Sequence, residues 1–141
     1  MDDIQPLPQP TARDIAARVS AGRMTPEEAV RESLDRIAAV DGAVNAFTEV
    51  WADRAISEAR ELAARPDLAD LGLAGVPFAL KDNTARDNDV VRRLVQAGAI
   101  PVGTTANPQF CAWGTTDAPG RITRNPVRPG LSPGGSSGGA A

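Results

Sequence analysis

Apolar residues recur at helical spacing through the first forty residues of the chain. Thr11 precedes a stretch with apolar residues on one side, which predicts a capped helix over residues 12–21. A second capping signature, Thr25 with Glu28 three residues later, begins another helical pattern with proline at its first position. This pattern predicts a helix that runs to about Val40 and is stopped by the Asp-Gly pair that follows.

The middle of the chain combines strand signals with one more helix. Residues 45–50 alternate between apolar and polar side chains, as in a half-buried strand, and alanine-rich residues 52–64 resume the helical period. Residues 73–80 form an almost continuous apolar run that ends abruptly at Lys81. We interpret this run as a buried strand that places Lys81 at its carboxyl end.

A helix and another strand follow. Asp87 or Asn88 can cap a helix that Gly98 closes, and residues 99–103 are typical of a strand. A strand, helix, strand unit favours parallel strands joined by a right-handed crossover. We therefore predict an α/β fold, with N-terminal helices followed by part of a mixed, largely parallel sheet flanked by helices. Beyond it the pattern weakens, and residues 119–139 are crowded with glycine, proline and serine.

Composition is that of one globular domain. The chain has 141 residues, of which 42% are hydrophobic and 23% charged, and no apolar run is long enough to cross a bilayer. The N-terminus is acidic and contains proline, whereas a secretory signal needs a basic start and an apolar stretch. We therefore expect a cytoplasmic protein that does not contact a membrane.

Residue types that are rare or missing argue against several kinds of site. Histidine is absent and Cys111 is the only cysteine, so we expect no internal disulfide, no metal site and no Ser-His-Asp triad. The net charge is −3 with acids and bases interspersed, and aromatic residues make up 4%, which argues against direct binding of nucleic acid. No cofactor is expected.

The most informative candidate chemistry lies between Ser132 and Gly139. Two adjacent hydroxyl groups, Ser136 and Ser137, stand there between two pairs of glycines, and glycine lets a backbone approach a ligand closely. The composition alone fits a flexible linker equally well. A phosphate-binding loop is disfavoured, because the P-loop pattern ends in Gly-Lys-Ser/Thr and here two alanines follow. An isolated lysine at a strand end, such as Lys81, is most often a solvated residue.

Six segments of the chain resemble, in the same order, the amidase signature family. The resemblance covers the chain from about Thr11 to Ala141, and six segments in one order are far more specific than any one alone. The segments are residues 73–83, 89–94, 97–103, 107–110, 123–126 and 133–139.

Members of this family hydrolyse amides with a Ser, cis-Ser, Lys triad. The resemblance places the lysine at Lys81 and the cis-serine at Ser136, after a cis peptide bond from Gly135, with Ser137 and Gly134 as supporting residues. It implies that neutral Lys81 takes a proton from Ser136, which relays the demand to the nucleophile. Bringing a lysine pKa from about 10.4 to near 7 corresponds to roughly 4–5 kcal/mol of destabilisation of the ammonium.

The chain departs from the family pattern in three places. The family's nucleophile and oxyanion hole lie in a later Asp-x-Gly-Gly-Ser segment, beyond the counterpart of Ala141, so we expect neither in this chain. After Asn83 the family has a longer connection with glycine and threonine, whereas here residues 84–86 lead directly to the next helix. Residues 103–106 are Gly-Thr-Thr-Ala where many relatives have Gly-Lys-Thr-Asn. We therefore expect the N-terminal part of an amidase domain, inactive on its own.

The expected domain has a flexible N-terminus over residues 1–10, a helical region over 11–66, and the start of the α/β core over 67–141, ending in the glycine- and serine-rich loop. The resemblance implies a large mixed sheet that draws strands from beyond this piece. Apolar faces and strand edges of the piece would then stay uncovered, so we expect marginal stability or aggregation.

Four functions remain open from the sequence. The first is an amidohydrolase that converts a small carboxylic amide to an acid and ammonia or an amine, and whose intact parent could form a homo-oligomer. The second is the A-type subunit of a glutamyl-tRNA amidotransferase, which supplies ammonia to a misacylated transfer RNA. The others are a non-catalytic interaction module with a flexible glycine-rich tail, and a functionless remnant.

Overall fold

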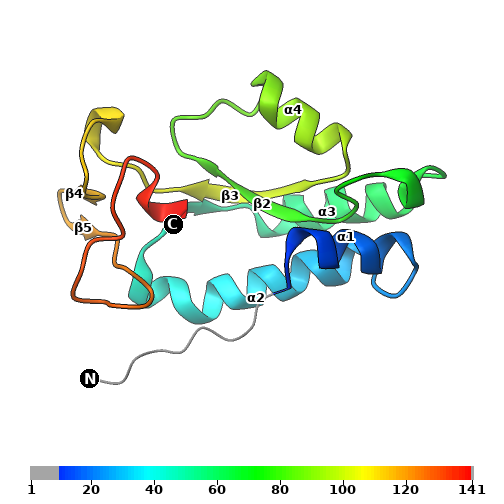
Figure 1. Cartoon of the computed structure of the whole chain (residues 1–141), viewed down its shortest axis with the longest axis horizontal. Coiled ribbons are helices and arrows are strands. Elements are labelled where there is room, and N and C mark those ends of the chain that lie inside the picture. Colours follow the sequence, from blue (N-terminus) through cyan, green and yellow to red (C-terminus); the bar gives the residue numbers. More distant parts are fainter. Residues whose placement is uncertain (1–9, 141) are drawn as a thin grey trace.

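The computed structural model describes residues 10–140, so the expected flexible segment 1–10 lies outside the described residues except for Pro10. Within that range, helices surround a three-stranded sheet, and a two-stranded hairpin and a C-terminal loop follow (Figure 1). This arrangement confirms the predicted α/β fold. The elements are α1 (Ala12–Ser20), α2 (Pro26–Val44), β1 (Phe47–Val50), α3 (Ala52–Ala63), β2 (Pro77–Lys81), α4 (Asp89–Gln96), β3 (Ile100–Thr105), β4 (Asp117–Ala118) and β5 (Arg121–Ile122).

The first two helices begin where the capping signatures predict. The Thr11 hydroxyl accepts a hydrogen bond from the Asp14 amide at 3.1 Å, and the Asp14 carboxylate accepts one from the Thr11 amide at 3.0 Å. Thr25 and Glu28 form the same reciprocal pair at the start of α2. The hydrogen bonds from the two threonines lower the pKa of both carboxyl groups.

The predicted end of the second helix at Val40 is wrong, because α2 continues to Val44. A glycine inside a helix costs only about 1 kcal/mol relative to alanine, so Gly42 does not end α2. The helix ends instead at Asn45, which has a left-handed backbone with a φ of 55° and donates its amide hydrogen to the Asp41 carbonyl. The Asp41 carboxylate accepts hydrogen bonds from the next two backbone amides and so turns the chain toward β1.

β3 is the central strand of the sheet, between β1 and β2. β2 runs parallel to β3 and β1 runs antiparallel to it, so the sheet is mixed, as predicted. The connection from β2 to β3 contains α4, which Asn88 caps by accepting a hydrogen bond from the Val90 amide at 2.9 Å. β3 is buried along its whole length and continues to Thr105 rather than ending at Gly103.

The predicted strand over residues 73–80 is only partly correct, because β2 begins at Pro77. Gly75 has a φ of 71°, which is a turn conformation rather than a strand conformation. The Gly75 amide donates to the Gly98 carbonyl at 2.9 Å, which ties this turn to the connection between α4 and β3. The apolar residues before β2 are therefore buried in a packed turn, and burial alone could not separate that turn from a strand.

α2 and α3 cover one side of the sheet, and α4 lies on the other side (Figure 1). The apolar cluster between α2, α3 and the sheet consists of Val30, Ala55, Ala59, Leu62, Ile100 and Val102. A second cluster joins α1 to the turn before β2 and consists of Ile15, Ala16, Val19, Met24, Ala29, Ala74, Val76 and Ala99. No helix among residues 10–140 combines the length and the apolar character that crossing a membrane requires.

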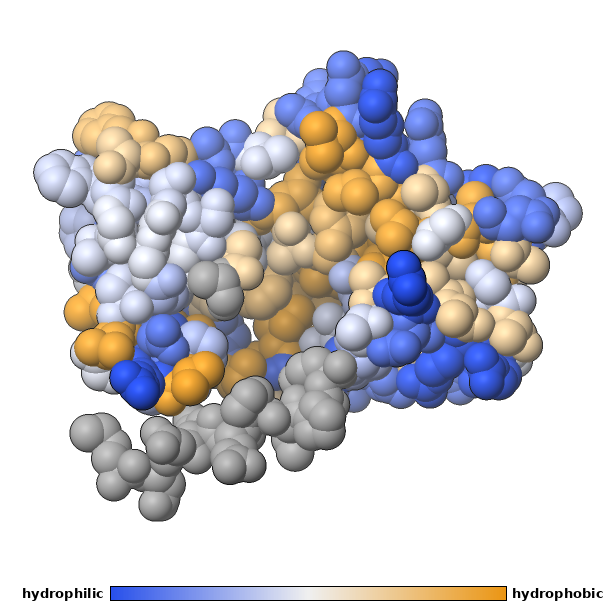
Figure 2. Space-filling model, viewed as in Figure 1, coloured by the Kyte–Doolittle hydropathy of each residue, from blue (hydrophilic) through white to orange (hydrophobic). Residues whose placement is uncertain are grey.

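Part of the apolar surface is uncovered. Val90 and Val95 on α4 are 65% and 41% exposed. β2 is an edge strand, paired on one side only within the described residues. Figure 2 shows an apolar hollow over the sheet, between α4 and the C-terminal loop. These features support the expectation of marginal stability or aggregation, which stays a prediction.

Candidate active site

Lys81 is the last residue of β2, and β3 holds this strand end in place. In the parallel register Lys81 pairs with Thr105. The Thr105 hydroxyl donates a hydrogen bond to the Leu80 carbonyl at 3.2 Å, and the Asp82 amide donates one to the Thr105 carbonyl at 2.9 Å. The backbone is therefore fixed on both sides of Lys81.

The glycine-rich C-terminal loop reaches the same end of the sheet, where β2 and β3 both finish (Figure 1). The Gly139 amide donates a hydrogen bond at 2.9 Å to the carbonyl of Ala106, the residue that follows β3. A Cβ atom on Gly139 would lie 2.5 Å from the Ala106 nitrogen and 2.8 Å from its carbonyl oxygen, so a side chain does not fit there. Gly138 and Gly139 are buried. Such close packing argues against a flexible linker.

The fold brings Lys81 and Ser136 into direct contact across 55 positions of sequence. Lys81 Nζ lies 2.9 Å from Ser136 Oγ, and both residues are half-buried. The peptide bond between Gly135 and Ser136 is cis, as the resemblance implies. Lys81 is the only lysine of the chain. Within residues 10–140 no carboxylate lies within ion-pair distance of its amine. An amine and a hydroxyl at this distance can exchange a proton.

The supporting residues lie on the same loop but outside this contact. Ser137 is exposed, and among the described residues its hydroxyl makes no hydrogen bond to Lys81 or Ser136. Gly134 has a φ of 92°, a conformation that favours glycine. Gly135 packs against the backbone of Trp113, whose carbonyl oxygen would lie 2.2 Å from a Cβ at that position. These glycines shape the loop, and Ser136 alone carries a hydroxyl to Lys81.

Three further polar residues meet beside Lys81 that the sequence did not single out. The Thr48 hydroxyl on β1 lies 2.7 Å from the Thr104 hydroxyl and donates a hydrogen bond to the Asp82 carboxylate at 3.2 Å. The Asp82 carboxylate is therefore held toward β1. The available sequence signal was weak, because Thr48 and Thr104 alternate with apolar residues as any half-buried strand positions do.

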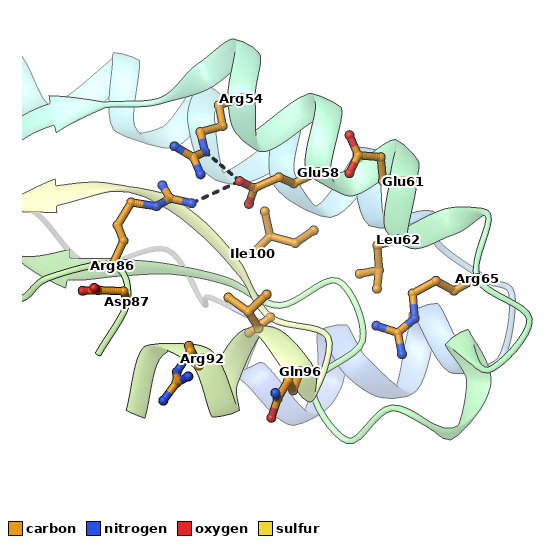
Figure 3. Close-up of a pocket in the computed structure, with 12 residues that line it drawn as sticks. Arg54, Glu58, Glu61, Leu62, Arg65, Arg86, Asp87, Arg92, Gln96 and Ile100 are labelled. Carbon is orange, nitrogen blue, oxygen red and sulfur yellow. Dashed lines mark hydrogen bonds and ion pairs between the residues drawn. The ribbon is translucent and has the colours of Figure 1, made fainter. Parts of the chain in front are cut away.

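A separate cleft of about 710 Å³ opens between α3 and α4 (Figure 3). Charged side chains line much of it, and Glu58 on α3 forms ion pairs with Arg54 at 2.7 Å and with Arg86 at 3.1 Å. Neither Lys81 nor Ser136 lines this cleft. The cleft borders the short connection that follows Lys81, because Arg86 and the next residue belong to both.

The described part of the chain contains no group of three or more histidine, cysteine, aspartate or glutamate side chains that could hold a metal ion. Cys111 is a half-buried free thiol, and its sulfur accepts a hydrogen bond from the Asn107 side chain at 3.2 Å. The candidate chemistry therefore rests on the Lys81–Ser136 contact.

Comparison with known proteins agrees with this fold. The amidase family model matches residues 28–86 and 84–141, which together make up most of the chain. The chain therefore belongs to the amidase family.

One similar protein is a glutamyl-tRNA(Gln) amidotransferase component from Acidothermus cellulolyticus, its A-type subunit. It is 40% identical over 153 aligned positions and is matched by 93% of this chain. A bacterial aryl acylamidase of the amidase signature family superposes with a TM-score of 0.79 at 27% identity over 92% of this chain. A peptide amidase in complex with the inhibitor chymostatin superposes with a TM-score of 0.75 at 32% identity over 91% of this chain. These three matches cover 30%, 32% and 32% of the respective relatives.

The comparisons also locate the shortened connection. The alignment with the Acidothermus protein spans 153 positions, more than the 141 residues of the whole chain, so that relative has residues that this chain lacks. The two parts of the family match meet at residues 84–86. The family's longer connection after Asn83 is therefore shortened here, as the sequence indicates.

Proposed function

We propose that this chain is the N-terminal portion of an amidohydrolase, in which Lys81 and Ser136 are two of the three members of a Ser, cis-Ser, Lys triad. The observation that carries the proposal is the 2.9 Å contact between Lys81 Nζ and Ser136 Oγ at the end of the sheet. Amidase family membership supports it. A small carboxylic amide as substrate, a cytoplasmic location and self-association of the intact parent belong to the same proposal.

The contact suits a proton relay. Neutral Lys81 would accept the proton of the Ser136 hydroxyl, and Ser136 would in turn accept the proton of the nucleophilic hydroxyl as that oxygen attacks the amide carbonyl. The carbon–nitrogen bond then breaks, the leaving amine takes up the proton, and water hydrolyses the acyl-enzyme. The amine of Lys81 must be unprotonated at the start of this relay, and no carboxylate within ion-pair distance stabilises its charged form among the described residues.

A second candidate is the A-type subunit of a glutamyl-tRNA amidotransferase. The 40% identity to the Acidothermus protein favours it. The same Lys81–Ser136 pair would then release ammonia from an amide for transfer to a misacylated transfer RNA. Genes for the other subunits beside the gene for this chain, and ammonia production that increases when those subunits are added, would distinguish this function from that of a free-standing amidase.

The test is amide hydrolysis by the 141-residue chain and by a version extended through the coding residues beyond Ala141, on a panel of simple amides. Because the family's nucleophile follows the counterpart of Ala141, we expect hydrolysis by the extended chain alone. Equal activity of the short chain would overturn the proposed nucleophile position. Silence of both, with each chain shown to be folded, would contradict the amidohydrolase proposal.

A further inference from the structure

Thr116 is a buried hydroxyl residue in the segment that leads into the β4–β5 hairpin. Only 2% of its surface is exposed. A buried hydroxyl needs a hydrogen-bond partner, and that of Thr116 donates to the Gly134 carbonyl at 2.9 Å. Its own carbonyl accepts a hydrogen bond from the Thr123 amide at 3.1 Å, which anchors Thr116 to the hairpin. Thr116 is therefore a fixed point beneath the C-terminal loop.

Thr116 also fills the space beside Gly138. A Cβ atom on Gly138 would lie 1.8 Å from Thr116 Oγ1 and 2.7 Å from Thr116 Cβ, which no side chain tolerates. Gly134 precedes Ser136 by two residues and Gly138 follows it by two. One threonine side chain thus holds both arms of the short turn that carries Ser136.

A neighbouring contact points the same way. The Trp113 carbonyl oxygen packs against Gly135, where it would lie 2.2 Å from an added Cβ atom. Residues 113–116 therefore contact the loop on both sides of Ser136. The position of the Ser136 hydroxyl depends on this segment as well as on the loop itself.

We propose that Thr116 is a positioning residue for Ser136, whose hydroxyl group fixes the loop so that Ser136 Oγ points at Lys81 Nζ. This inference rests on the proposed function of the Lys81–Ser136 pair. Thr116 forms no hydrogen bond with either residue and acts through Gly134 and Gly138. It is therefore not a catalytic residue.

The hydroxyl and the volume of Thr116 can be separated by substitution. Valine keeps the volume but leaves the Gly134 carbonyl without its donor, so Thr116→Val isolates the hydrogen bond. Serine keeps the donor, so Thr116→Ser is the matched control. Gly138→Ala tests the same contact from the other side, because its added carbon displaces the threonine hydroxyl.

The measurement uses the single lysine of the chain. Labelling the 141-residue protein with carbon-13 lysine gives one Cε–Hε NMR cross-peak for the side chain of Lys81, and Ser136→Ala defines how far that peak moves when the Lys81–Ser136 contact is lost. We expect Thr116→Val and Gly138→Ala to move the peak in the same direction as Ser136→Ala. We expect Thr116→Ser to leave it at the wild-type position.

Each other outcome is informative. A wild-type peak in Thr116→Val, together with a shifted peak in Ser136→Ala, would overturn the role of Thr116 alone. An unmoved peak in Ser136→Ala would instead remove the contact on which the proposed function rests. If Thr116→Val fails to fold, Thr116→Ser and Gly138→Ala decide: a shift in the serine variant, or no shift in the alanine variant, contradicts the inference.

Discussion

The guanidinium carbon of Arg86 lies 4.5 Å from the centre of the Trp51 ring. Arg86 also donates a hydrogen bond to the Glu58 carboxylate at 3.1 Å. Glu58 belongs to α3 and Trp51 directly precedes it, whereas Arg86 ends the shortened connection after Lys81. These two contacts therefore attach that connection to α3 (Figure 3).

Removing this attachment should weaken the fold. We expect Arg86→Ala to lower the free energy of unfolding by about 1–2 kcal/mol, since a cation–π contact contributes about 0.5–1 kcal/mol and a partly exposed ion pair up to about 1 kcal/mol. Arg93→Ala on exposed α4 is the control, with an expected change within about 0.5 kcal/mol. Urea denaturation measures both, and equal stabilities of the two variants would show that Arg86 holds nothing.

The seat of the C-terminal loop on β3 can be tested at Gly139. Gly139→Ala places a carbon against the backbone of Ala106, so we expect a loss of about 1–3 kcal/mol in the free energy of unfolding. The amide of residue 139 should also exchange its hydrogen faster, because its bond to the Ala106 carbonyl is disturbed.

Gly130→Ala is the matched control for this change. No atom lies within 4 Å of a Cβ built on Gly130, so that variant should keep wild-type stability. If both variants behave alike, the loop is not seated on β3, and the flexible-tail interpretation gains support.

Stability should depend on pH through Glu27. Hydrogen bonds from Arg60 and Arg31 lower the pKa of the Glu27 carboxyl from 4.5 to about 2. Because the folded pKa lies below the unfolded value, the stabilisation is fully present above about pH 4.5 and is lost as the pH falls to about 2. Wild type and Glu27→Gln should thus differ in free energy of unfolding at about pH 6 and converge as the pH falls through this window. A difference that stays constant from about pH 6 to about pH 2.5 would contradict the role of this ion pair.

The uncovered valines of α4 predict self-association of the short chain. Replacing exposed Val90 and Val95 by lysine removes apolar surface without touching the buried face of α4. Sedimentation should show less association for this double variant than for wild type at equal concentration. A wild-type chain that stays monomeric and melts cooperatively and reversibly would contradict the expectation.

The parts of the fold that sequence predicts well are those set by neighbours along the chain. The caps at Thr11 and Thr25 depend on residues three positions away, and the start of both helices is confirmed. The end of α2 was wrong because the choice between Gly42 and Asn45 depends on contacts that form only in the folded chain. The start of β2 was misplaced for a similar reason, since apolar residues are buried in turns as well as in strands.

Sequence predicts less of the site itself. Lys81 and Ser136 were proposed from the family resemblance, and no periodicity links positions so far apart. Thr116 was missed, because its partner Gly134 lies 18 residues away. The strands β4 and β5 that hold it have two residues each, too few to produce an alternating pattern.

The most direct test of the central claim is amide hydrolysis by the extended chain carrying Lys81→Met or Ser136→Ala, with Ser57→Ala on the exposed side of α3 as the control. If the two residues form the proton relay, each variant should lower kcat by at least about a hundredfold, and the control should keep wild-type activity. Wild-type rates in a folded Lys81→Met variant would show that the 2.9 Å contact with Ser136 is not part of the catalytic machinery.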